Sequence, residues 1–335
     1  MHRSRTRGLV AATALVVLAG ACSSGDDATV TTTTTAAATT TVATTTTTAP
    51  TTTTTEPPPT TTTTEPPTTT TTTMFVVEDP PEPLPVEPPE GYELVWSDEF
   101  DGDVIDPANW TYDIGGWGWG NGEAQYYTDR PRNARVQDGV LIIEAHFERF
   151  ENAYYTSARL KTEELQEFQY GYFEVRSKVP AGKGLWPAFW MLGTTFERDE
   201  SNPIDSNWPF AGEIDVMEYV GRAPNNTYGT IHGPGYAGAG SLGKWNEQDE
   251  PIHEDWHTHA VEWTEDGFRW FYDGEFYGEV GKDLVGNREW VYDQPYFMLL
   301  NLAVGGLFPG PVGFDVEFPK QFLVDHVRVY QRIEE

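Results

Sequence analysis

The sequence is poor in cysteine, in basic residues and in long apolar runs, and each shortage excludes something. Cys22 is the only cysteine, so no intramolecular disulfide can form. Lys and Arg number 21 against 52 Asp and Glu, which gives a formal net charge of −31. A surface of that sign repels nucleic acid and anionic lipid, so we expect neither as a partner.

The N-terminal part also has almost no aromatic side chains, since nearly all Trp, Tyr and Phe residues follow residue 90. Residues 23–90 are rich in Thr and Pro, and such a segment has little apolar surface to bury. We therefore predict a disordered linker over residues 23–90, followed by one domain over residues 91–335. A domain of roughly 245 residues is large enough to bury a single core.

The first 22 residues predict an export signal. Basic residues precede an apolar stretch from Gly8 to Gly20, which is too short to cross a bilayer core of ~30 Å. Leu18 to Cys22 resembles a lipobox, so we expect lipid attachment at Cys22 and a cell-surface protein anchored at the membrane. The alternative is ordinary cleavage after a small residue, which would leave the protein secreted.

The segment after Gly91 predicts an all-β domain. Short strand-like runs alternate with turn signals, and Asp273-Gly274 is a two-residue hairpin signal. Leu323 to Tyr330 alternates with period two, whereas only Thr162 to Gln169 has a weak helical pattern. The strand-like runs are Val140–Ala145, Gly171–Val179, Phe268–Tyr272, Glu275–Tyr277, Tyr296–Val304 and Phe322–Tyr330. Many short strands at regular spacing indicate a sandwich or a jelly roll.

The densest chemistry lies in the run from Glu213 to Glu218, Glu-Ile-Asp-Val-Met-Glu, whose apolar residues favour a strand. In a regular strand Glu213 and Asp215 share one face, and Glu218 points into the core. Burying an unpaired carboxylate is costly, so we predict a β-bulge near Val216-Met217 that turns all three acids to one side.

Three acids on one face favour glycoside hydrolysis. Their mutual repulsion separates their pKa values, so that one carboxylate can attack the anomeric carbon while another, still protonated, releases the leaving sugar. Two other interpretations stay open. The acids could form a solvated strand face, or a metal site, although a metal would want more oxygen or nitrogen ligands nearby.

Tryptophans near these acids suggest a sugar-binding cleft. Trp186 and Trp190 lie four residues apart, and Trp117 and Trp119 lie among glycines, where a core could not bury both well. Sugars present apolar C–H faces that stack on indole rings. His232 follows the acidic strand across an expected turn and could contact a ligand or be structural.

These residues together resemble glycoside hydrolase family 16, and within it the bacterial laminarinase-like endo-1,3-β-glucanases. The resemblance covers about Tyr92 to Gln331. It rests on the bulged form Glu-x-Asp-x-x-Glu at Glu213 to Glu218, with supporting stretches at 119–123, 184–190, 229–233 and 300–306.

The resemblance implies a β-jelly-roll sandwich of two antiparallel sheets, concanavalin A-like, with a substrate cleft on its concave face. It implies a retaining enzyme with Glu213 as nucleophile, Glu218 as acid/base and Asp215 as assisting acid. It also implies substrate contacts from Asn121, Arg159, Trp186, Trp190, His232 and Asn301. We expect β-glucan as substrate, no cofactor for catalysis, and a monomer.

The resemblance further implies a structural calcium ion, with ligands from Glu99, the carbonyl of Gly139, and Asp325; these acids could equally be plain surface residues. Three rival functions stay open. They are a hydrolase of mixed-linkage glucan or another polysaccharide, a transglycosylase, and a non-catalytic β-glucan-binding protein. Residues 194–210 and 234–250 resemble variable loops that could set the linkage preference.

Overall fold

The structure, a computed structural model, describes residues 87–199, 202 and 205–333. The expected signal peptide, Cys22 and nearly all of the expected linker lie outside the described residues. In this part of the chain two β-sheets make up the fold, joined by loops and short 3-10 turns. No helix of the described residues has the length and apolarity needed to cross a membrane.

The first sheet has ten strands, and every pairing in it is antiparallel except that of β3 with β6. In spatial order its path is β16 (Glu275–Gly281), β15 (Gly267–Tyr272), β14 (His257–Thr264), β9 (Gly171–Lys178), β18 (Lys320–Arg332), β5 (Val140–Phe150), β6 (Ala153–Ser157) and β3 (Gln125–Tyr127). Two further strands join its side, β1 (Tyr92–Asp98) on β18 and β4 (Ala134–Gln137) on β5.

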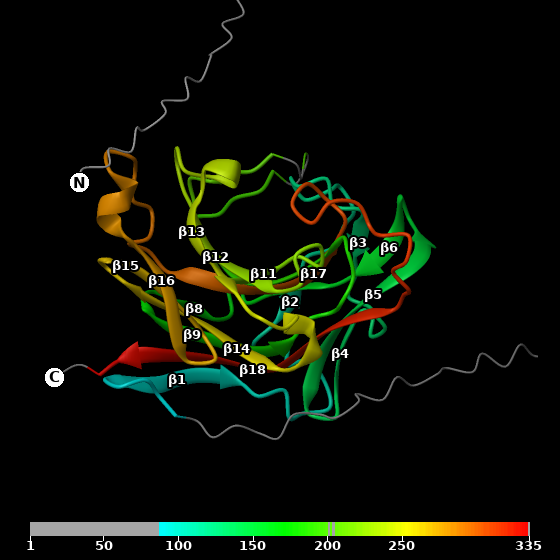
Figure 1. Cartoon of the computed structure of the whole chain (residues 1–335), viewed down its shortest axis with the longest axis horizontal. Coiled ribbons are helices and arrows are strands. Elements are labelled where there is room, and N and C mark those ends of the chain that lie inside the picture. The colour runs from blue at the N-terminus through cyan, green and yellow to red at the C-terminus, as the bar shows by residue number, and fades with distance from the viewer. Residues whose placement is uncertain (1–86, 200–201, 203–204, 334–335) are drawn as a thin grey trace, which may run out of the picture. The chain divides into compact units, whose positions relative to one another are not determined.

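The second sheet has eight strands and carries the predicted acids near its middle. Its path is β13 (Leu242–Glu247), β12 (Asn226–His232), β11 (Glu213–Tyr219), β10 (Leu185–Gly193), β17 (Tyr296–Val304), β7 (Arg159–Lys161) and β2 (Thr111–Tyr112), with β8 (Glu167–Phe168) beside β17. In Figure 1 this sheet forms the upper layer around β11, β12 and β17, and β1 and β18 lie in the lower layer.

The core lies between the sheets and is filled by alternate residues of the strands. Phe173 and Val175 of β9 pack in the same cluster as Met298 and Leu300 of β17. Two-residue spacing sends these side chains inward and their neighbours outward, as the alternating sequence pattern requires. The predicted all-β jelly-roll sandwich is therefore confirmed.

Two local predictions fared differently. The Asp273-Gly274 hairpin turn is confirmed, since both residues have positive φ, 47° and 78°, and link β15 to β16. The weak helix expected over 162–169 is wrong. Glu164 has a positive φ of 61°, which an α-helix does not allow, and the Thr162 hydroxyl closes a turn by donating to the Gln166 carbonyl.

The regular alternation expected from Leu323 to Tyr330 is also interrupted. The pairing of β18 with β9 shifts register between Val324 and His326, so Val324 and Val327 both enter the core. The bulge has a physical reason, because Asp325 and His326 are consecutive polar residues, and a regular strand would direct one of them into the apolar core between the sheets.

Candidate active site

The three acids of the predicted motif reach the cleft because β11 is bulged. Between Asp215 and Glu218 the pairing with β12 shifts register, so three steps along β11 match two along β12. Val216 and Met217, although consecutive, both pack in the core. Glu213, Asp215 and Glu218 all line one cleft on the other side of the sheet. The bulge predicted from the spacing of the acids is confirmed.

The cleft has a volume of about 800 Å³ and crosses the strands of the eight-stranded sheet. Every residue predicted to act on or contact the substrate lines it. These are Glu213, Asp215, Glu218, Asn121, Arg159, Trp186, Trp190, His232 and Asn301. Segments more than one hundred residues apart in sequence therefore meet at one site, which is where a sugar chain can be held against the acids.

Each outer acid accepts a hydrogen bond from a tryptophan. Nε1 of Trp208 donates to Oε2 of Glu213 over 2.9 Å, and Nε1 of Trp186 donates to Oε1 of Glu218 over 3.1 Å. Both carboxyl groups are thus fixed in orientation by rigid indole rings. Trp208 was not found from the sequence, because it lies on the loop before β11, where no periodic pattern indicates which side chain turns back to the sheet.

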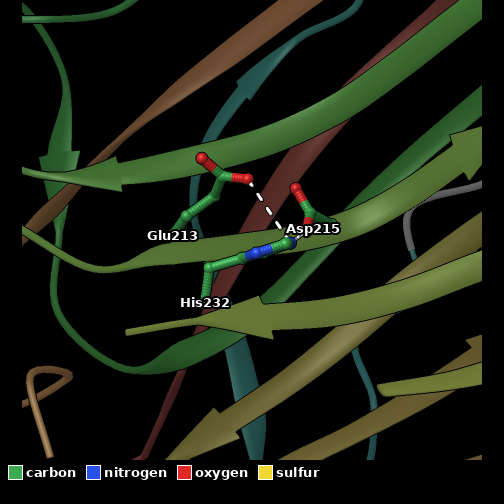
Figure 2. A group of neighbouring side chains, drawn as sticks. All are labelled: Glu213, Asp215 and His232. Atoms are coloured by element: carbon green, nitrogen blue, oxygen red, sulfur yellow. Dashed lines mark ion pairs between the residues drawn. The ribbon is translucent and has the colours of Figure 1, made fainter. Parts of the chain in front are cut away.

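His232 of β12 lies beside two of the acids. Its Nε2 is 3.6 Å from Oε1 of Glu213 and 3.1 Å from Oδ2 of Asp215. Figure 2 shows Glu213 and Asp215 projecting from β11 to the same side, where their carboxylates approach the His232 ring from the neighbouring strand. The ring therefore lies closer to the central acid than to the nucleophile candidate.

The environment gives Glu213 and Glu218 different pKa values. Burial, aided by the Asp215 carboxylate, raises the pKa of Glu213 to about 7, while His232 and the Trp208 N–H limit the rise. Burial and the negative charges of Asp215 and Glu213 raise the pKa of Glu218 well above its ordinary value. Glu213 therefore ionises first and Glu218 keeps its proton longer, as a nucleophile and a general acid require.

Two influences compete at His232. Burial lowers the pKa of the ring, but the carboxylates of Glu213 and Asp215 outweigh burial and raise it to about 9. Against this, the backbone N–H of Gly238 donates to Nδ1 over 3.0 Å, which requires a lone pair on that nitrogen. A second proton would break this bond, so we assign the ring one proton, carried on Nε2.

The same contact argues against a metal at this position. Glu213, Asp215 and His232 offer ligand atoms within 4.8 Å of one another. However, a histidine that binds a metal through one nitrogen donates a proton from the other. Here Nδ1 of His232 accepts from Gly238, so a metal on Nε2 would set two N–H groups against each other.

A buried network positions three of the predicted substrate residues. Trp190 donates to Asn301 over 2.7 Å, Asn301 donates to the Tyr127 hydroxyl over 3.2 Å, and Tyr127 donates to Glu123 over 3.1 Å. Asn121 donates to the other oxygen of Glu123 over 3.2 Å. The side-chain oxygen and nitrogen of Asn301 therefore both bond to protein groups. Asn301 supports the Trp190 ring as well as lining the cleft.

The calcium positions implied by the resemblance lie on the ten-stranded sheet. The Arg328 guanidinium donates to both oxygens of Glu99, over 2.9 and 2.8 Å. Oδ2 of Asp325 lies 3.1 Å from Arg176 and 3.0 Å from Nδ1 of His326. Gly139 lies in the turn between β4 and β5. As placed, these carboxylates face cationic side chains and do not fit a calcium ion.

An all-β sandwich with a long open cleft, two carboxyl groups of different acidity and indole rings beside them defines a glycoside hydrolase. The chain belongs to glycosyl hydrolases family 16, whose model matches residues 119–313. Catalysis in this class needs no cofactor, in line with the organic acid and base groups that the cleft supplies.

Similar proteins are known from several bacteria. A protein described as beta-glucanase, from Rhodothermus marinus, is 44% identical over 252 residues, covering 72% of this chain and 86% of that protein. Glucan endo-1,3-beta-glucosidase A1 of Niallia circulans is 36% identical over 273 residues, covering 72% of this chain and 38% of that protein. The catalytic domain of an endo-1,3-beta-glucanase (laminarinase) from Thermotoga petrophila RKU-1 superposes with a TM-score of 0.67 at 43% identity, covering 72% of this chain and 99% of that one.

Proposed function

We propose that the protein is a retaining endo-1,3-β-glucanase that cuts β-glucan chains by double displacement. The observation that carries the proposal is the bulged strand β11, which presents Glu213 and Glu218 to one cleft with their acidities separated. The activities in the names of the similar proteins support the 1,3 linkage.

In the first step Glu213, ionised, attacks the anomeric carbon, and Glu218 gives its proton to the departing glycosidic oxygen. The Trp208 N–H donates to the Glu213 carboxylate and stabilises it before attack, and the His232 ring lies beside it. In the second step Glu218, now ionised, removes a proton from water, which attacks the same carbon and releases Glu213. Two displacements retain the anomeric configuration.

Asp215 acts through its neighbours. Its carboxylate raises the pKa of both glutamates and lies 3.1 Å from the His232 ring. It therefore helps keep the proton on Glu218 in the free enzyme and orients the His232 ring beside Glu213. We assign it an assisting role, not a covalent one.

The test is hydrolysis of laminarin, curdlan, lichenan and agarose by the purified protein, with the products followed by proton NMR. Early release of short β-anomers from laminarin and curdlan is the expected result. Early α-anomers would overturn the retaining mechanism. Preference for lichenan would move the assignment to a mixed-linkage hydrolase, and longer recombined chains would indicate a transglycosylase. Tight binding without cleavage would indicate a glucan-binding protein.

We also propose that the protein is exported and held at the cell surface by lipid on Cys22, as a monomer. The proposal rests on the sequence from Leu18 to Cys22 and on the Thr-rich segment after it, which would hold the domain at a distance from the membrane. Radiolabelled palmitate should enter the wild-type protein and not Cys22→Ala. Equal release of both proteins into the medium would contradict the anchor.

Calcium stays a prediction of the resemblance alone, and the basic partners of Glu99 and Asp325 weigh against it. Chelation with EDTA followed by thermal unfolding decides the matter. A midpoint that falls on chelation and returns with calcium would establish the ion. A change within about 1 °C, which is less than 1 kcal/mol for a domain of this size, would exclude a structural role.

A further inference from the structure

Side chains from two loops that are far apart in sequence meet in the lining of the cleft. Trp117 and Trp119 come from the segment between β2 and β3, and Arg198 comes from the segment between β10 and β11. The Arg198 guanidinium carbon lies 5.6 Å from the centre of the Trp117 ring and 4.7 Å from that of Trp119. Such cation–π contacts strengthen when water is excluded, so the two loops hold each other.

The two tryptophan rings of this contact are held in place by their own neighbours. The Trp119 ring also packs against Arg159, at 4.7 Å, and its Nε1 donates to the Gly115 carbonyl over 3.2 Å. Gly115 has to be glycine, since a Cβ there would lie 1.8 Å from the Trp117 ring. Two arginines therefore occupy the space over Trp119, and its ring is not free to stack on a sugar.

The loop that carries Arg198 is fixed at its base. The side chain of Asn207 accepts from the Glu197 amide over 3.0 Å and donates to the Thr195 carbonyl over 2.7 Å. Arg198 and Ser206 form an antiparallel bridge. Arg198 also lies 3.7 Å from Asp113, on the far side of the contact. These contacts hold the guanidinium against Trp117 and Trp119.

Beyond the contact lies a second cavity of about 410 Å³. Five residues line both this cavity and the cleft, and so form the partition between them: Trp117, Arg159, Leu192, Phe196 and Arg198. The second cavity is also lined by Asp113, Lys161 and Glu163, whose polar groups suit sugar hydroxyls.

We propose that Arg198, held against Trp117 and Trp119, ends the substrate cleft and so limits the number of sugar units bound on that side of the cleaved bond. The inference rests on the proposed glucanase function and adds the length of chain that the site accepts. Without the arginine side chain, the cleft and the second cavity join, and further sugar units of a neutral β-glucan enter.

The test uses the full chain and 1,3-β-glucan oligosaccharides of increasing length, labelled at the reducing end so that the cleaved bond can be mapped. For the wild type, kcat/KM should stop rising at the length that fills the cleft. For Arg198→Ala it should keep rising over further units, by roughly threefold to tenfold, with longer fragments from the partition end. Trp117→Ala, which opens the partition from the other loop, should act in the same direction.

Arg269→Ala is the matched control, because Arg269 packs over Phe271 and Phe276 on the other sheet and pairs with Glu262. It should keep the wild-type length profile. Identical profiles for Arg198→Ala and the wild type, or equal losses at every length, would overturn the partition while leaving the glucanase function intact. Failure of the wild type to cleave any of these oligosaccharides would overturn the proposed function and this inference with it.

Discussion

In each sheet a bulged strand, β11 in one and β18 in the other, carries acids that lie beside a histidine, and the two clusters have different partners. In the cleft cluster, the carboxyl groups of Glu213, Asp215 and Glu218 face indole N–H groups and the His232 ring. The outer cluster, Glu99, Glu174, Asp325 and His326 on the ten-stranded sheet, faces the guanidinium groups of Arg176 and Arg328.

The difference in partners explains the difference in acidity. Burial raises the pKa of Glu213 and Glu218, and His232 and the indole N–H groups only partly offset it. Burial acts on Glu99 too, but the Arg328 guanidinium more than offsets it and lowers the pKa of that carboxyl. Acids held by arginine stay ionised and stabilise the fold, whereas acids without such a partner keep a proton available for chemistry.

The largest expected effect is on turnover. Glu213→Gln removes the nucleophile and should lower kcat by about 10⁴-fold or more, since the amide cannot form the covalent intermediate. Because the change is nearly isosteric and removes a buried charge, the midpoint of thermal unfolding should equal or exceed that of the wild type. Kinetics on laminarin and calorimetry check both. Retention of more than about a few per cent of kcat would show that the nucleophile is another residue.

The outer cluster should behave in the opposite way. Arg328→Leu leaves Glu99 without its two-bond partner, and we expect a loss of about 2 kcal/mol, or roughly 4–8 °C in the unfolding midpoint, with kcat unchanged. The estimate is below that for a fully buried pair, because the Glu99 side chain is 36% exposed. Arg269→Leu, which breaks a more exposed pair with Glu262, serves as control and should cost less than about 1 kcal/mol.

The pH dependence of stability should differ in sign between Glu213 of the cleft cluster and Glu99 of the outer cluster. The folded-state pKa of Glu213, about 7, lies above its ordinary value of 4.5, so the stability it contributes is present at low pH and lost as pH rises through about 7. We expect ~2–3 kcal/mol of stability to be lost between about pH 5 and pH 8. Glu213→Gln should flatten this slope. The Glu99 contribution has the opposite sign and is lost only in acid, as its lowered pKa requires.

Much of this site was predictable because local rules govern it. The spacing of Glu213, Asp215 and Glu218 conflicts with a regular strand, and a bulge resolves the conflict without burying a carboxylate in the core. The same conflict exists at Asp325-His326, but there the alternation of the flanking residues hid it. The helix expected after Thr162 failed because one positive φ, at Glu164, outweighs a weak pattern.

Contacts between loops were not predictable in the same way. The bonds from Trp208 to Glu213 and from Arg198 to Trp117 depend on how segments between strands fold back, and no periodicity governs that. The Arg328–Glu99 pair was missed for another reason. Two acids and a glycine matched a family's calcium ligands. Arg328, which faces one of these acids, lies within strand β18, and nothing in the sequence around it indicated that it would pair with Glu99.

The smallest expected effect tests the neutral donors of the cleft. Trp208→Phe keeps an aromatic ring but removes the N–H that donates to Glu213. The bond stabilises the ionised carboxylate, so its loss should raise the pKa of Glu213 and move the acid limb of the kcat/KM profile upward by about one pH unit. Activity should fall roughly tenfold below the limb and little above it. A uniform loss at every pH would mean that Trp208 serves only to bind sugar, and that His232 alone keeps the nucleophile ionised.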